Sequence, residues 1–270
     1  GLHDRAMNAS NNMSDRKEML QEALMAQRQM LVDAIGKRAE DIPQAFTPYK
    51  EVLDVYDEGL ELPDDVTIIW PDDNYGYMKR LSSPKEQKRS GRSGVYYHSS
   101  YLGKPHDHLW MNTTSPTLMY EELRKAYDMT ADRIWLLNAG DIKSCEFAVD
   151  FFLSMAYDID SFNFDRAATY RTEWLCGMLG DEYRNEYQDV INSFYKLAFA
   201  RRPEFMGWGY QWATDKHGRE RNTDTDFSLT NYREVDSRLS EYRRIGSITE
   251  KILNKLPEEK KACFYQSLYY

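Results

Sequence analysis

The alternation of β-rich runs with helical patterns across residues 1–158 is the feature that most constrains the fold. Four short runs rich in β-branched and aromatic residues predict strands at 42–47, 66–70, 94–98 and 133–138, although Pro43 weakens the first. Strands that alternate with helices predict a parallel sheet with right-handed crossovers. The repeated order fits either a barrel or an open doubly wound sheet, with residues 1–4 as the tail of a strand whose body precedes the chain.

Helical spacing of apolar residues fills the gaps between these runs. Ser14 is the expected N-cap of the first helix, Gly59 ends the second, and Ser115 with Pro116 opens the third in the preferred cap-then-proline order. The predicted helices of this half cover about 14–35, 52–57, 115–127 and 147–155.

The pattern changes at about Asn163, after which no β-rich run follows. The remaining helical segments are 165–178, 181–199, 231–254 and 257–270, and 204–230 is expected to be a long ordered loop. We therefore predict an α/β domain over 1–160 and an α-helical bundle domain over 161–270. Neither end carries a start or stop signal, so we expect the chain to be a piece of something longer.

Charge and composition limit the classes of binding partner that the chain can have. Lysine and arginine number 35 against 44 acidic residues, a net charge of −9 that argues against nucleic acid. The sequence has no run of eighteen apolar residues, so it predicts no membrane-spanning helix. The three cysteines have no metal-ligand spacing and are expected to be buried thiols. Aromatic residues reach 14%, which fits either a well-filled core or rings that stack on sugars.

Polar side chains follow each predicted strand, where parallel α/β folds carry their functional groups. The candidates are His3, Asp4, Lys50, Glu51, Asp72, Asp73, Asn74, Tyr75, His98, Tyr101 and Asn138. Acids, amides and phenols suit a hydroxyl-rich ligand and acid/base chemistry with two carboxylates. The chain has no Gly-x-Gly-x-x-Gly, Walker or Gly-x-Ser-x-Gly motif, so nothing indicates nucleotide binding or a serine hydrolase.

Structural explanations compete with these functional ones. Asp4 also fits a loop cap, and Glu51 also fits the first turn of a helix, where the macrodipole favours an acid. The run at 70–77 is harder to explain structurally, because adjacent carboxylates after a buried strand are unfavourable unless they bind something. His106-Asp107-His108 has ligand chemistry but no third ligand nearby, so we expect no metal. The basic loop at 79–92 is either a solvated surface or an attractor of acidic substrate.

At these loops the sequence resembles glycoside hydrolase family 115, the bacterial xylan α-1,2-glucuronidases. The matching stretches are GLHDRAM (1–7), PYKEVLDVYDEGL (48–60), WPDDNYGYMKRL (70–81), GVYYHSSYLGKPHDHLW (94–110) and LLNAGDIK (136–143). The resemblance implies the C-terminal half of a (β/α)8 TIM-type barrel followed by an α-helical bundle domain. The missing N-terminal half of the enzyme would supply further barrel strands and acidic residues.

The resemblance also implies an activity without a cofactor. Such enzymes remove glucuronic acid or 4-O-methyl-glucuronic acid from xylan with inversion. Glu51 matches the proposed general acid, Asp4 matches an essential aspartate that acts as base or positions water, and Asp72 and Asn74 match sugar-contacting residues. His98, Tyr101 and Asn138 are implied only to lie near the site. Because a cation favours a charged carboxyl, Lys50 is expected to point away from Glu51 or to bind the uronate.

Two other functions remain open from the sequence. One is a non-catalytic sugar-binding or structural fragment, and the other is a different barrel enzyme acting on acidic sugars, such as a lyase. The expected partner is xylan or a glucuronoxylo-oligosaccharide, and the family implies secretion or a periplasmic location. The helical region also has aromatic faces that would suit a homodimer.

Overall fold

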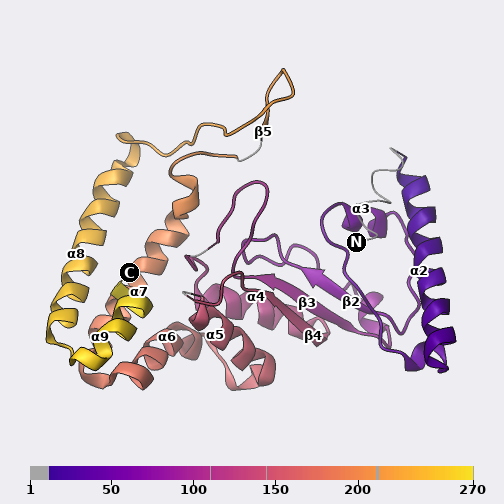
Figure 1. The fold of residues 1–270 in the computed structure, drawn as a ribbon, viewed down its shortest axis with the longest axis horizontal. Coiled ribbons are helices and arrows are strands. Elements are labelled where there is room, and N and C mark those ends of the chain that lie inside the picture. The colour runs from indigo at the N-terminus through magenta and orange to yellow at the C-terminus, as the bar shows by residue number, and fades with distance from the viewer. Residues whose placement is uncertain (1–11, 110, 144, 211–212, 270) are drawn as a thin grey trace. The chain divides into compact units, whose positions relative to one another are not determined.

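The computed structural model describes residues 12–109, 111–143, 145–210 and 213–269 (Figure 1). Its contacts group into two compact units. The first unit holds the described part of Gly1–Asp73 with Tyr77–Tyr97 and Leu123–Leu136, and the second holds Asn74–Gly76, His98–Glu122 and the described part of Leu137–Tyr270. The predicted boundary at residues 160 and 161 falls within the second unit and remains a prediction.

A four-stranded sheet in the order β1-β2-β3-β4 is formed by Ala45–Phe46, Thr67–Pro71, Ser93–His98 and Ala131–Asn138. β2 pairs in parallel with both β1 and β3. The prediction of a parallel sheet with helices is confirmed, whereas closure into half of a barrel remains a prediction. β1 has two residues instead of the six predicted, and Pro43, which has no N–H to donate, lies just outside it.

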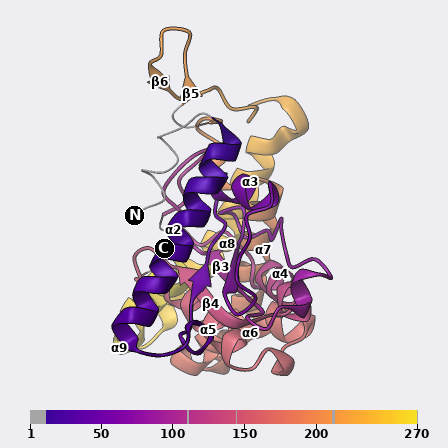
Figure 2. The ribbon, with the colours of Figure 1, turned by 90° about the vertical axis from the view of Figure 1, so that its right-hand side faces the viewer.

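The first unit has a core beneath α2 (Met13–Ile35) and α3 (Glu51–Asp57), which contact each other (Figure 2). Phe46, Val52, Leu60 and Val66 form this core, and Leu20 and Leu24 of α2 pack against it. The predicted cap was wrong by two residues: Asn12 is the N-cap, and its Oδ1 accepts the N–H of Ser14 at 3.1 Å. An amide oxygen can cap a helix as well as a hydroxyl can.

The other helices match the predicted segments with shifted ends. They are α4 (Pro116–Asp128), α5 (Glu146–Tyr157), α6 (Phe164–Leu179), α7 (Arg184–Ala200), α8 (Glu234–Lys255) and α9 (Glu258–Phe264), the last followed by the π-helix η7 (Tyr265–Tyr269). Short 3-10 turns are η1 (Ala39–Asp41), η2 (Glu86–Lys88), η3 (Ile159–Ser161), η4 (Asp181–Tyr183), η5 (Pro203–Phe205) and η6 (Asn231–Arg233). The predicted loop at 204–230 carries most of η5 and the antiparallel pair β5 (Ala213–Thr214) and β6 (Glu220–Arg221).

Helix α7 packs against both α6 and α8 in the second unit (Figure 1). Their shared core includes Leu175, Tyr187, Ile191 and Ile252, and Phe264 of α9 joins it. Leu175, Tyr187 and Phe264 are fully buried. No helix within the described ranges is both long enough and apolar enough to cross a membrane.

Candidate functional site

The loop after β1 carries Lys50 and Glu51 in the first unit. Lys50 adopts φ 52° and ψ −124°, a conformation that residues with a side chain rarely take. Glu51 begins α3 directly after it and is partly buried. The Lys50 side chain is exposed, and its Nζ lies 5.2 Å from the ring centre of Tyr49. A strained backbone therefore immediately precedes the predicted general acid.

The loop after β2 carries Asp72 and Asp73. Asp72 is only 5% exposed, and its N–H donates to the carbonyl of Tyr96 on β3 at 3.1 Å. Asp73 holds a turn, because its Oδ1 accepts the N–H of Tyr77 at 3.1 Å. The Tyr96 ring also contacts the ring of Tyr49, with centres 5.9 Å apart. Tyr96 thus lies beside both loops, which carry the three predicted acidic residues Glu51, Asp72 and Asp73 of the first unit.

Asn74, Tyr75 and Gly76 form a tight turn that belongs to the second unit. Asn74 has φ 73° and Gly76 has φ 98°, so a non-glycine residue occupies the left-handed region. The carbonyl of Asn74 accepts a hydrogen bond from Nε2 of His108 at 2.5 Å. The Tyr75 hydroxyl donates to the carbonyl of His106 at 2.5 Å and accepts the His106 N–H at 3.0 Å. Burial raises the pKa of Tyr75, so its hydroxyl stays protonated near neutral pH.

His98 and Tyr101 join this turn through ring contacts. The rings of His98 and Tyr101 meet edge to face at 5.7 Å, and the Tyr75 ring lies 6.3 Å from Tyr101. His98 and Tyr101 are 1% and 4% exposed, so a ligand would reach only the edges of these side chains. The carbonyl of Asn138, at the end of β4, accepts the N–H of Ser99 at 3.0 Å, which places Asn138 beside the same loop.

His106 and His108 act as anchors in the fold. Nε2 of His106 is 2.8 Å from the carbonyl oxygen of Trp208, so each histidine is bonded to a backbone carbonyl. Nε2 of each ring carries the donated proton and is therefore not a metal ligand in this arrangement. Among the residues that the structure describes, no group of three or more His, Cys, Asp or Glu is arranged to hold a metal ion.

Residues 202–208 border this cluster, and no sequence motif pointed to them. Phe205 packs edge to face on His106 with ring centres 4.5 Å apart, and Trp208 stacks on His106 at 5.5 Å. Arg202 donates to the carbonyl of Tyr75 at 2.5 Å. Helical spacing ends at this point of the chain and no motif replaces it, so only the folded structure identifies these contacts.

Glu204 carries an unusual carboxyl on the same segment. Its Oε2 is buried and has no hydrogen-bond partner among the described residues. Burial raises the pKa of Glu204, and this effect outweighs its own backbone N–H and the nearby Arg202 and His106, which lower the pKa. The neutral, protonated form of Glu204 is therefore favoured over a wider pH range than that of a solvated glutamate.

His3 and Asp4 lie outside the described residues, so the structure does not test their placement. Of the other predicted positions, the first unit holds Lys50, Glu51, Asp72 and Asp73, and the second holds Asn74, Tyr75, His98, Tyr101 and Asn138. Each group is brought together within its own unit.

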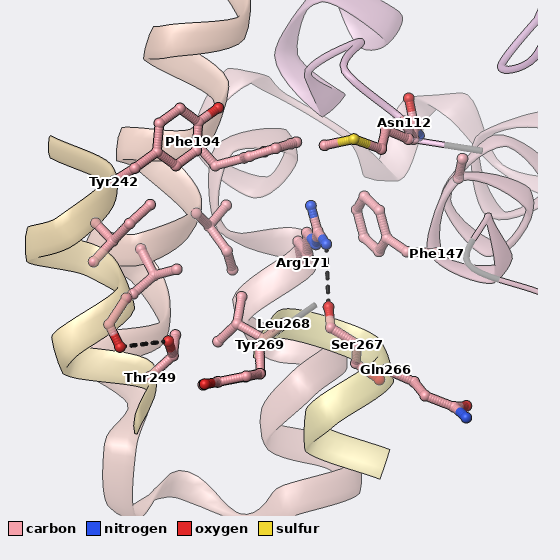
Figure 3. Close-up of a pocket in the computed structure, with 16 residues that line it drawn as sticks. Asn112, Phe147, Arg171, Phe194, Tyr242, Thr249, Gln266, Ser267, Leu268 and Tyr269 are labelled. Carbon is pink, nitrogen blue, oxygen red and sulfur yellow. Dashed lines mark hydrogen bonds between the residues drawn. The ribbon is translucent and has the colours of Figure 1, made fainter. Parts of the chain in front are cut away.

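A separate cavity of about 260 Å³ lies among the helices of the second unit (Figure 3). Arg171 projects into its centre, where Nη1 donates to the Tyr195 hydroxyl at 2.9 Å and Nη2 donates to the carbonyl of Ser267 at 3.1 Å. Its guanidinium also lies 5.3 Å from the ring centre of Phe147. These contacts tie α6 to η7, which indicates a role for Arg171 in packing.

Comparison with known proteins identifies a family model and a solved structure that match this chain. The model of glycosyl hydrolase family 115 matches residues 1–205. Among solved structures, one of a family 115 4-O-methyl-α-glucuronidase with specificity for decorated arabinogalactans is similar at 34% identity and a TM-score of 0.87. The match covers 96% of this chain and 34% of that one, so the present chain spans about a third of its length. A comparison with curated protein sequences finds no match.

Proposed function

This chain belongs to glycosyl hydrolase family 115, and from that premise we propose that it forms part of an enzyme that releases glucuronic acid or 4-O-methyl-glucuronic acid side chains from a polysaccharide. The proposal includes the N-terminal half of the enzyme as a partner, since the chain spans a third of the similar structure. Ile134 and Leu136 on β4 are 36% and 45% exposed, which suits a sheet against which more protein packs.

Strain in the two strand-end loops is the observation that carries this proposal. Lys50 and Asn74, at φ 52° and 73°, directly adjoin Glu51 and the Asp72-Asp73 pair. Non-glycine residues persist in such conformations only where the surroundings over-determine them, and they concentrate at active sites and ligand clamps. Residues predicted as acid and sugar ligands therefore lie beside strained backbone, which supports a functional role for both loops.

The proposed mechanism is inverting hydrolysis by two carboxylates. Glu51 protonates the leaving oxygen, and Asp4 activates or positions the attacking water on the opposite face of the sugar. Such carboxyls stand roughly 6.5–9.5 Å apart to leave room for the water. Lys50 is exposed, and its ammonium group is assigned to the uronate carboxylate. Asp72 and Asn74 supply hydrogen bonds to sugar hydroxyls.

The polysaccharide backbone has two candidates. The sequence resemblance points to xylan, and the similar structure is of an enzyme specific for decorated arabinogalactans. Parallel digestion of glucuronoxylan and of a glucuronidated arabinogalactan separates them by the amount of free uronic acid released. An unsaturated product would instead indicate a lyase. No product from either polysaccharide, together with retained binding to them, would indicate a sugar-binding fragment.

The central test is Glu51→Gln in the full-length protein, with Glu58→Gln at the exposed end of the same helix as the matched control. Loss of the general acid is expected to lower release of uronic acid by at least about a hundredfold, because general acid catalysis contributes about 10²–10⁴-fold. The control is expected to keep normal turnover. Near-normal turnover by Glu51→Gln would remove Glu51 from the role. Proton NMR of the first-formed anomer tests inversion.

Two further parts of the proposal concern context. A homodimer predicts a molecular mass of twice the chain in light scattering, and a monomeric mass would contradict it. Secretion or a periplasmic location predicts that the protein is recovered from the medium or the periplasmic fraction of its host.

A further inference from the structure

Arg202 connects the end of α7 to two loops that lie far from it in the sequence. Its Nη2 donates to the carbonyl of Tyr75 at 2.5 Å, across 127 residues of chain. Its Nη1 donates to the hydroxyls of Thr113 at 3.0 Å and Thr114 at 3.3 Å. Thr113 and Thr114 are 5% and 2% exposed, so the two acceptor hydroxyls are largely shielded from water. The guanidinium centre also lies 5.5 Å from the ring centre of Tyr75.

The carbonyl that Arg202 holds belongs to the strained turn. Asn74 lies at φ 73°, Gly76 lies at φ 98°, and Tyr75 stands between them. His108 fixes the carbonyl of Asn74, and Arg202 fixes the next carbonyl along the chain. Two side chains from distant segments therefore hold the peptide planes on either side of Tyr75, which keeps the backbone of the turn in its strained conformation.

We propose that Arg202 is a positioning residue that holds the Asn74 turn in the conformation that binds a uronic acid sugar. This inference rests on the proposed function, because it takes Asn74 as a ligand of that sugar. Arginine suits the task because its planar fork reaches several acceptors at once. Lysine presents a single point charge and would hold one acceptor while leaving the others unpaired.

A double-mutant cycle in the full-length protein tests this inference. Asn74→Ala, Arg202→Ala and the double variant are compared by calorimetric titration with glucuronic acid and by KM and kcat on a glucuronidated oligosaccharide. Arg202→Ala is expected to weaken sugar binding about tenfold to a hundredfold, since small misplacements of a positioned group have effects of this size. In the Asn74→Ala background the same change is expected to add less than about twofold, because both variants remove one interaction.

Arg201→Ala is the matched control. Arg201 lies on the same segment and pairs instead with Glu234 at 2.5 Å and Asp226 at 2.6 Å. It is expected to alter thermal stability while leaving sugar affinity within about twofold. If Arg202→Ala does not fold, Arg202→Lys replaces it in the cycle, and weakened binding with near-normal melting temperature is the expected result.

The outcomes separate this inference from the function beneath it. Equal losses from Arg202→Ala with and without Asn74 would show independent, purely structural effects and overturn the positioning role. Normal sugar affinity in Arg202→Ala would also overturn it. If Arg202→Ala weakens sugar binding but Asn74→Ala does not, the inference is overturned, while the proposed binding of a uronic acid sugar still stands. Absence of any uronate binding by the unaltered protein overturns the proposed function itself.

Discussion

Arg80 and Glu86 form a two-point ion pair, with Nη1 to Oε2 at 3.0 Å and Nη2 to Oε1 at 2.8 Å. The Arg80 guanidinium also lies 4.5 Å from the ring centre of Trp70, and Glu86 accepts the hydroxyl of Tyr56 at 2.8 Å. Arg92 is paired with Asp132 in a similar way. Arg80 and Arg92 of the basic loop are therefore engaged within their own unit, which favours the structural interpretation for these two residues.

Glu86→Gln should destabilise the protein in a pH-dependent manner. Burial by itself would raise the pKa of Glu86, but hydrogen bonds from Arg80 and Ser83 outweigh it and hold the pKa at about 2, below its usual 4.5. The stabilisation is therefore present above pH 4.5 and is lost as the pH falls toward 2. We expect Glu86→Gln to lower the free energy of unfolding by about 2 kcal/mol at pH 7 and by much less at pH 3.

Urea denaturation at both pH values measures this difference. Glu40→Gln is the control, because Glu40 is 53% exposed and pairs only at the surface with Arg38. It should change stability by less than about 1 kcal/mol. An equal loss at pH 7 and pH 3 for Glu86→Gln would contradict the ionic origin of the effect.

Glu204→Gln should stabilise the protein at neutral pH, in contrast to the destabilising Glu86→Gln. Burial raises the pKa of Glu204 in the folded protein, so its contribution is favourable below pH 4.5 and is lost as the pH rises through the folded value. An amide stays neutral throughout. Glu204→Gln should therefore match the original protein in melting temperature near pH 4 and exceed it at pH 7. A variant that is less stable at pH 7 would show that the carboxylate has a favourable partner in the folded state.

Asn74 offers a way to separate backbone from side chain. Asn74→Gly keeps a residue suited to φ 73°, whereas Asn74→Ala places a Cβ-bearing residue with no local hydrogen bond there. Both should lose affinity for glucuronic acid in calorimetric titration. Only Asn74→Ala should also lose about 1–2 kcal/mol of stability in thermal unfolding. Unchanged affinity in Asn74→Gly would argue that the turn, and not the amide, serves the site.

Gly94 marks a close approach of strands β3 and β4. A Cβ at this position would lie 2.1 Å from the carbonyl oxygen of Ile134, and the backbone cannot easily yield. Gly94→Ala should lower the free energy of unfolding by about 3 kcal/mol or more. Gly177→Ala is the control, because nothing lies within 4 Å of a Cβ there and helix α6 should gain up to about 1 kcal/mol. Comparable unfolding curves for the two variants would contradict the close approach.

Local patterns predicted much of the fold and of the candidate site. Ile68, Ile69 and Trp70 are buried in a strand as their apolar run predicts, and the apolar spacing of 165–178 corresponds to α6. The position of Glu51 and Asp72 after strands follows from the same patterns, because the end of a strand is a local property of the chain. The prediction of the first strand was too long because Pro43 interrupts the predicted run. The predicted cap was wrong because Asn12 competes with Ser14 for that position.

The sequence by itself determined which residues follow each strand and which helices have an apolar face, because hydrophobic periodicity is a property of short stretches of neighbouring residues. Only the tertiary structure decided that Arg202 holds the carbonyl of Tyr75 and that His106 anchors the carbonyl of Trp208. These bonds join residues about a hundred positions apart or more, and no local pattern encodes such a pairing. Their strength comes from burial, which exists only after the chain has folded.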